Sequence, residues 1–160
     1  MANYRISAQD NLAAGGAKTK AKQNIAAIEL LKKIEAEQRE ATLEEQATLV
    51  KYSGWGAAPD IFTGKDDWSS LQDQLKALLT DKEYETARAS TLNAHYTEPA
   101  VVDEIYAGLE GLGFTGGRIL DPSMGASGMF EGLMPESLRQ NSDITGIEID
   151  SISGRIATHL

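Results

Sequence analysis

The residues most able to do chemistry lie in the stretch LDPSMGASGMF, residues 120–130, and at one glutamate further along. Asp121 follows a short apolar run, Gly125 and Gly128 lie in the turn after it, and Glu148 stands twenty-three residues beyond Gly125. Exposed backbone amides in such a turn favour oxygen-rich groups, and small residues let a ligand approach closely. A carboxylate about twenty residues downstream can accept both hydroxyls of a ribose. The spacing predicts a nucleoside site; the alternative is a plain glycine loop with a solvent-facing glutamate.

Two short strands and a helix must position these residues. Residues 117–121 (GRILD) are predicted to form a buried strand, 127–134 a short helix and 144–150 (ITGIEID) a second strand, with another helix from residue 151. A parallel β-α-β unit brings the carboxyl ends of its strands to one edge of the sheet. Asp121, the glycines and Glu148 are therefore expected at that edge.

A further helix is predicted just before the first strand, within residues 95–113 (HYTEPAVVDEIYAGLEGLG). Thr97 is expected as its N-cap and Pro99 in its first turn, where a missing amide costs little. His95 is expected to be a turn residue.

The upstream part of the chain is predicted to be helical. Residues 1–22 are polar and contain glycines, which is typical of a flexible arm, and residues 23–94 form the helical region. Apolar residues recur at three-residue steps after Asn24, which indicates an amphipathic helix. Capping boxes at Thr42–Glu45 and Thr80–Glu83 predict two further helix starts.

Several other chemistries find no support in the residues. The chain has no cysteine and only two histidines, which lie far apart in sequence, so no metal site is expected. The glycine-containing stretch 53–60 (SGWGAAPD) lacks the lysine of a phosphate-binding loop. Trp55 within it is interpreted as a packing anchor, with stacking on a nucleic-acid base as the alternative.

Negative charge is concentrated in the second part of the chain. Residues 1–50 hold seven Lys/Arg and seven Asp/Glu, whereas residues 51–160 hold eight and seventeen, which accounts for the net charge of -9. Such a surface repels phosphate backbones, so strong nucleic-acid binding is not expected. It suits a basic protein partner or simply favours solubility. No signal-peptide pattern or membrane-length apolar run is present, so a cytoplasmic protein without a membrane partner is expected.

Three segments resemble motifs of class I S-adenosylmethionine-dependent methyltransferases, particularly N6-adenine DNA methylases. RILDPSMGASGMF resembles their first cofactor motif, ITGIEID their ribose-binding motif, and HYTEPAVVDEIY the segment that precedes the first strand. Residues 23–160 together resemble the N-terminus of large methyltransferase–helicase proteins of phages, plasmids and integrative elements. The resemblance implies an α/β fold: a helical N-terminal region followed, over residues 95–160, by an incomplete Rossmann-like β-α-β unit.

The resemblance also implies a role for individual residues in binding S-adenosylmethionine. Thr97 and Pro99 would flank the methionine end of the cofactor, and Glu148 would hold the ribose. Asp150 would lie near the adenine. The residues implied to shape the pocket itself are Asp121, Ser123 and Gly125.

The sequence departs from the methylase pattern at three places. Ser127 stands where the family usually has glycine, and its Cβ is expected to crowd the cofactor or reshape the turn. Glu98 is an extra residue between the threonine and the proline. The catalytic (Asn/Asp)-Pro-Pro-(Tyr/Phe) tetrapeptide is absent. The chain is therefore expected to bind the cofactor weakly or not at all, and not to methylate alone.

Three functions are compatible with these residues. The first is the cofactor-motif part of a DNA adenine methyltransferase-like protein, whose partner is the remainder of the larger methyltransferase–helicase polypeptide. The second is an anti-defence protein that inhibits a host defence nuclease, of restriction or CRISPR type, through its acidic surface. The third is a structural domain that docks the rest of a larger chain.

Overall fold

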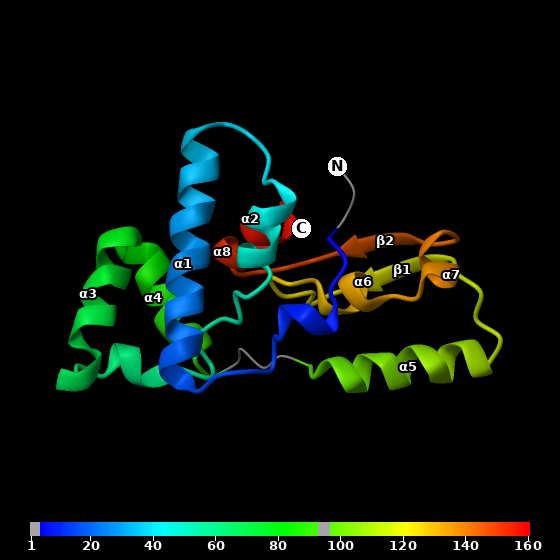
Figure 1. The fold of residues 1–160 in the computed structure, drawn as a ribbon, viewed down its shortest axis with the longest axis horizontal. Helices are drawn as coiled ribbons and strands as arrows, with labels where there is room; N and C mark the ends of the chain where they lie inside the picture. The colour runs from blue at the N-terminus through cyan, green and yellow to red at the C-terminus, as the bar shows by residue number, and fades with distance from the viewer. Residues whose placement is uncertain (1–3, 93–96) are drawn as a thin grey trace.

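The computed structural model describes residues 4–92 and 97–160 and shows a mixed α/β chain with one small parallel sheet (Figure 1). Helix α1 contacts α2, α3 and α8. In Figure 1 the strands and α5 lie to the right of α2 and α8, on the side away from α1. The elements in chain order are η1 (Ala8–Asp10), α1 (Ala17–Ala36), α2 (Leu43–Leu49), η2 (Pro59–Phe62), η3 (Asp66–Trp68), α3 (Ser69–Leu78), α4 (Asp81–Ser90), α5 (Pro99–Gly111), β1 (Arg118–Asp121), α6 (Met129–Leu133), α7 (Glu136–Arg139), β2 (Asp143–Gly146) and α8 (Ser151–Ala157).

Both predicted capping boxes are confirmed. The Thr42 hydroxyl accepts a hydrogen bond from the Glu45 amide at the start of α2, and the Glu45 carboxylate accepts one from the Thr42 amide. Thr80 and Glu83 repeat this exchange at the start of α4. Each box satisfies two amides that have no partner within the helix.

The N-terminal segment is not a separate arm, contrary to expectation. Helix α1 already begins at Ala17, because the first turns are rich in alanine and lysine, which are strong helix formers. The segment before it packs on the C-terminal part of the chain: the Ile6 amide donates to the Gly132 carbonyl at 3.1 Å, and Arg5 donates to the Met134 carbonyl at 2.8 Å. These contacts bring the first described residues to the α6 segment.

Strands β1 and β2 pair in parallel, with Arg118 opposite Asp143 and Asp121 opposite Gly146. The crossover between them contains α6 and α7, so the predicted strand–helix–strand order is confirmed. The second strand is shorter than predicted and ends at Gly146, because the chain turns there to place Asp150 as the N-cap of α8.

Helix α5 begins one residue later than predicted. Its N-cap is Glu98, in an extended conformation without a side-chain capping bond, so the prediction that Thr97 caps this helix is wrong. Pro99 occupies the first turn as expected, because its missing amide needs no partner there. The prediction for His95 falls outside the described residues.

The apolar core forms two clusters. The larger one unites the helices of the N-terminal region with Ala126, Ile152 and Ile156, so the C-terminal helix α8 belongs to the same core as α1. The smaller one gathers Val102 and Tyr106 of α5 around the α6–α7 segment. Residues 23–94 and the C-terminal helix α8, which the sequence placed in separate regions, therefore contribute to the same apolar cluster.

Trp55 has no exposed surface and meets Phe62 edge-to-face at a centroid distance of 5.5 Å. The interpretation of this tryptophan as a packing anchor is confirmed. The loop around it is held by Asn24, a buried residue of α1 whose side-chain amide donates to the Gly54 carbonyl and whose oxygen accepts from the Ser53 amide.

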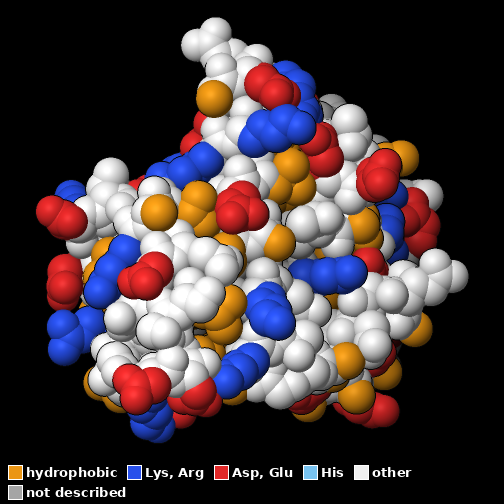
Figure 2. Space-filling model, turned by 60° about the vertical axis from the view of Figure 1, so that its left-hand side comes forward, with side chains coloured by type: hydrophobic (Ala, Val, Ile, Leu, Met, Phe, Trp, Pro, Cys, Tyr) orange, Lys and Arg blue, Asp and Glu red, His pale blue; other side chains and the backbone are white. Residues whose placement is uncertain are grey.

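Acidic and basic side chains are interspersed on the face that carries the helical part of the chain (Figure 2). The first 96 residues hold twelve Lys/Arg and fourteen Asp/Glu, whereas residues 97–160 hold three and ten. The excess of negative charge thus belongs mainly to the part of the chain that contains the sheet. Within the described residues, no helix combines the length and apolar character needed to cross a membrane.

Candidate functional site

A cavity of about 500 Å³ lies at the carboxyl ends of the two parallel strands. It brings together residues from three segments that the sequence singled out: Thr97, Asp121, Ser123, Gly125 and Glu148. Small-molecule sites in proteins enclose roughly 300–1,000 Å³, so the volume suits a nucleoside-sized ligand. Pro99, in the first turn of α5, is not among the lining residues.

The turn after β1 is fixed to the end of β2 by two backbone hydrogen bonds. The Ile147 amide donates to the Asp121 carbonyl at 2.8 Å, and the Met124 amide donates to the Ile147 carbonyl at 3.1 Å. The Asp121 carboxylate accepts from the Ser123 amide at 2.9 Å, which closes the turn on itself. Gly125 has a φ of 67°, a left-handed conformation that favours glycine. These bonds hold the turn after β1 against the cavity.

Glu148 lies two residues beyond β2 and is half-buried. One of its oxygens accepts a hydrogen bond from the Asp150 amide at 2.8 Å, which orients the carboxylate. A carboxylate has about four acceptor positions on its two oxygens, so Glu148 can still receive the hydroxyls of a ribose.

Asp150 also lines the cavity, but its carboxylate serves helix α8. It accepts from the amides of Ile152 and Ser153 at 3.4 and 3.1 Å, and from the Ser153 hydroxyl at 2.6 Å. The proximity of Asp150 to an adenine ring remains a prediction.

Ser127, expected to crowd the cofactor or to reshape the turn, does not line this cavity. It is 6% exposed and lines a separate cavity of about 220 Å³ beneath the turn, together with Gly128 and Glu131. Its hydroxyl has no hydrogen-bond partner.

Seven other residues line the cavity that the sequence analysis did not select: Gly54, Ser90, Met124, Met129, Phe130, Ile149 and Ser153. Gly54 and Ser90 come from the helical region, which therefore closes one side of the site. No local pattern links these two positions to the glycine turn. Ile149 is 99% exposed and directly follows Glu148 in the sequence.

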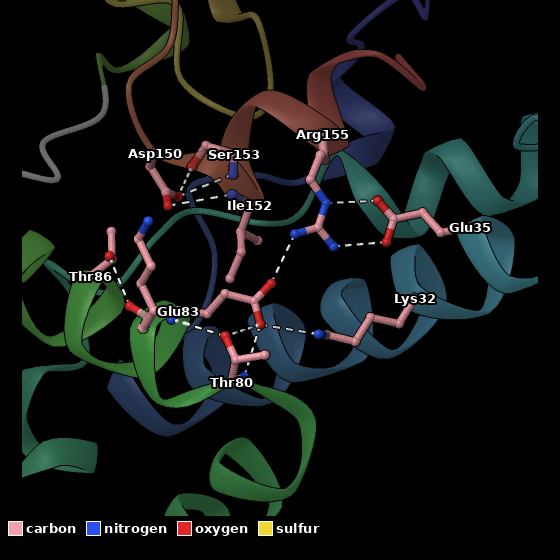
Figure 3. A network of polar contacts seen from close by, with 10 residues as sticks. Lys32, Glu35, Thr80, Glu83, Thr86, Asp150, Ile152, Ser153 and Arg155 are labelled. Carbon is pink, nitrogen blue, oxygen red and sulfur yellow. Dashed lines mark hydrogen bonds and ion pairs between the residues drawn. The ribbon is translucent and has the colours of Figure 1, made fainter.

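Helix α8 is anchored to the helical region by a network of charged side chains (Figure 3). Arg155 donates two hydrogen bonds of 2.7 Å to Glu35 of α1 and one of 2.9 Å to Glu83 of α4, and Lys32 reaches Glu83 at 3.2 Å. Burial alone would raise the pKa of Glu83, but hydrogen bonds from Thr80, Arg155 and Lys32 outweigh it and hold the pKa at about 2. The network fixes the helix whose N-cap, Asp150, lines the cavity.

The described side chains that line the cavity carry negative charge. Three carboxylates line it, those of Asp121, Glu148 and Asp150, and no Lys or Arg is present among its described lining residues. Such a site repels phosphate groups and attracts cationic ones. Within the described residues, no cluster of three or more His, Asp or Glu side chains could hold a metal ion.

Comparison of the chain with protein-family models, with curated proteins and with solved structures gave no match in any of the three. The assignment of the site therefore depends on its own residues and geometry.

Proposed function

We propose that this chain is the S-adenosylmethionine-binding part of an N6-adenine DNA methyltransferase-like protein, built on an incomplete Rossmann-like β-α-β unit. One observation carries the proposal. Six of the seven residues implied by the resemblance, all except Pro99, come from three separate segments and line a single cavity at the carboxyl ends of two parallel strands. Ligands of open α/β sheets bind at this edge.

The chemistry of the cavity fits S-adenosylmethionine better than a phosphorylated nucleotide. The cofactor carries a sulfonium and an ammonium group against one carboxylate, so its net charge is positive. Glu148 accepts the ribose hydroxyls, while Asp121 provides negative charge at the turn. Ser123 has a small side chain and Gly125 has none, so that the backbone of the turn can approach the ligand.

When bound, the cofactor supplies an activated methyl group. The residues of this chain bind and orient the cofactor, and none of them is assigned to the transfer itself, because the catalytic tetrapeptide is absent. The partner in this proposal is the remainder of a larger methyltransferase–helicase polypeptide, which would provide the target-base site.

Isothermal titration calorimetry with S-adenosylmethionine tests the proposal. We expect binding of the wild-type chain and a loss of roughly tenfold or more in affinity for Glu148→Ala, since a charged hydrogen-bond acceptor is removed. Glu104→Ala is the matched control, because Glu104 is an exposed glutamate of α5 outside the cavity, and its affinity should equal that of the wild type. Equal affinities for Glu148→Ala and wild type, or no heat at millimolar cofactor, would overturn the proposal.

Titration with ATP distinguishes the cofactor from nucleotides in general. Three carboxylates in the cavity should disfavour the triphosphate, so we expect ATP to bind much more weakly than S-adenosylmethionine. Tighter binding of ATP would assign the cavity to a different ligand class.

A second candidate function is favoured by the charge of residues 97–160, where ten Asp/Glu face three Lys/Arg. An acidic protein of this kind can compete with DNA for the basic channel of a host defence nuclease. Expression in a restriction-proficient or CRISPR-proficient host should then raise the survival of incoming target DNA. Unchanged survival in both hosts would exclude this function for those nucleases.

A further inference from the structure

Two of the described residues that line the candidate cofactor cavity come from the helical region, not from the part of the chain that carries the sheet. They are Gly54, in the loop between α2 and η2, and Ser90, the last residue of α4. Every other described lining residue lies within residues 97–160. The helical region therefore supplies one wall of the cavity, and a ligand that fills the cavity contacts both parts of the chain.

The backbone at Gly54 is fixed by the side chain of Asn24, which lies on α1 and has no exposed surface. The side-chain amide of Asn24 donates a hydrogen bond to the Gly54 carbonyl, and the side-chain oxygen accepts one from the Ser53 amide at 2.8 Å. Burying an amide side chain is costly unless its polar groups are paired, and here the amide and the oxygen both pair with the same loop. Asn24 therefore ties α1 to the loop that reaches the cavity.

The loop is also anchored immediately after Gly54. Trp55 has no exposed surface and packs edge-to-face on Phe62 at a centroid distance of 5.5 Å. Gly54 is buried and has a φ of 62°, a left-handed conformation that favours glycine. Of residues 53–56, only Gly54 is among the described residues that line the cavity. The loop thus presents a residue without a side chain to the cavity, so that a ligand can approach its backbone.

Ser90 adds a polar group to this wall. Its hydroxyl donates to the Ala87 carbonyl at 2.8 Å, so the hydroxyl proton is engaged and the oxygen keeps its acceptor positions. A ligand that carries ammonium or amino groups can donate to such an oxygen, whereas an ionised phosphate offers only acceptors. Ser90 therefore favours the same kind of ligand as the three carboxylates of the cavity.

We infer that the helical region takes part in binding the ligand of this cavity. Gly54 is a contact residue that limits the shape of the ligand, and Asn24, which is not among the described lining residues, is a positioning residue that holds Gly54 in place. The inference rests on the proposed function and adds a second part of the chain to the site, since the resemblance implies cofactor-binding residues only within 97–150.

Isothermal titration calorimetry with S-adenosylmethionine tests the contact at Gly54. We expect Gly54→Ala to lose roughly tenfold or more in affinity, because a methyl group on this buried residue crowds the ligand or shifts the wall. Gly64→Ala is the matched control and should bind like the wild type. Gly64 is an exposed glycine of the helical region with a φ of 74°, so alanine meets similar backbone strain there, but the residue does not line the cavity.

Tryptophan fluorescence tests the positioning role of Asn24. The chain has two tryptophans, so Trp68→Phe leaves Trp55 as the only one. Because Trp55 directly follows Gly54, saturation with S-adenosylmethionine should change its emission. Asn24→Ala in the Trp68→Phe background should bind severalfold more weakly and show a smaller emission change at saturation, since the loop is no longer tied to α1. A residue that only stabilised the fold would leave the emission change at saturation intact. Circular dichroism verifies the folding of each variant, and the Gly54→Ala comparison keeps Asn24 in place.

Several results would overturn the inference while leaving the proposed function standing, because that function is tested separately by Glu148→Ala. One is wild-type affinity for Gly54→Ala, and another is an equal loss for Gly54→Ala and Gly64→Ala, since backbone strain would then be the cause. A third is an unchanged emission of Trp55 at saturation. A full emission change in Asn24→Ala would remove the role assigned to Asn24. Absence of binding to the wild type overturns the proposed function, and this inference with it.

Discussion

The helical region and the two-stranded sheet bury their apolar side chains to very different extents. Ile28, Leu31 and Trp55 have no exposed surface, and the helix starts nearby are closed by complete capping boxes. In the sheet, no residue of β1 or β2 is fully buried, and Leu120 is 60% exposed. Parallel sheets are usually covered on both faces. The difference teaches that the core shared by the helical region and α8 is well buried, whereas the sheet presents surface that a partner can cover.

The largest effect is expected in the helical core. Trp55→Ala should lower the free energy of unfolding by about 3–5 kcal/mol, because it leaves a large cavity where the indole packs on Phe62. Urea unfolding followed by circular dichroism measures this change. If Trp55→Ala lowered the free energy of unfolding by less than a substitution in the sheet, the helical core would not be the more tightly packed of the two regions.

The next effect concerns the network that links the two regions. Glu83→Gln should cost about 1.5–3 kcal/mol at neutral pH, since hydrogen bonds to a charged group are lost. The folded-state pKa of Glu83, about 2, lies below its usual value of 4.5, so its charged form stabilises the fold above pH 4.5 and this contribution is lost as the pH falls toward 2.

The difference in unfolding free energy between wild type and Glu83→Gln should therefore shrink over this acidic range. Urea unfolding at a series of pH values measures it. A difference that stays constant down to pH 2 would contradict the role of the charged network. Glu104→Gln, on the exposed side of α5, serves as the control and should follow the wild type.

A smaller effect is expected at a helix start. Thr80→Ala removes the capping oxygen of α4 and should cost about 1 kcal/mol. Thr86→Ala, the same substitution within the same helix, should cost less, because alanine is the better helix former in the interior. Equal losses for the two variants would argue against the capping box as the source of the effect.

The smallest effect is expected in the sheet. Leu120→Ser changes a 60% exposed side chain and should alter the free energy of unfolding by less than about 0.5 kcal/mol. A loss comparable to that of Trp55→Ala would mean that the sheet is as tightly packed as the helical core.

Local signals in the sequence predicted most of the elements. Capping boxes act within four residues, so Thr42–Glu45 and Thr80–Glu83 marked helix starts correctly. The strand order and the convergence of Asp121 and Glu148 followed from the geometry of a parallel β-α-β unit.

Features that depend on distant contacts were not predictable in this way. Gly54 and Ser90 reach the cavity only because the helices pack as they do. Ser127 lines a separate cavity with Gly128 and Glu131 rather than the larger one, and the alternation of residue types alone does not reveal that placement. The early start of α1 reflects helix propensity in a segment whose polarity suggested a loop.

Helix α8 is held by polar contacts at both of its ends. Asp150 holds its first turn beside the cavity, and Arg155 ties its last turn to α1 and α4. A ligand that binds the carboxylate of Asp150 or Glu148 competes with the hydrogen bonds that these carboxylates accept at the start of α8. Occupancy of the cavity should therefore be visible at a distance, as altered hydrogen exchange of the α8 amides and of the helix ends to which Arg155 is tied.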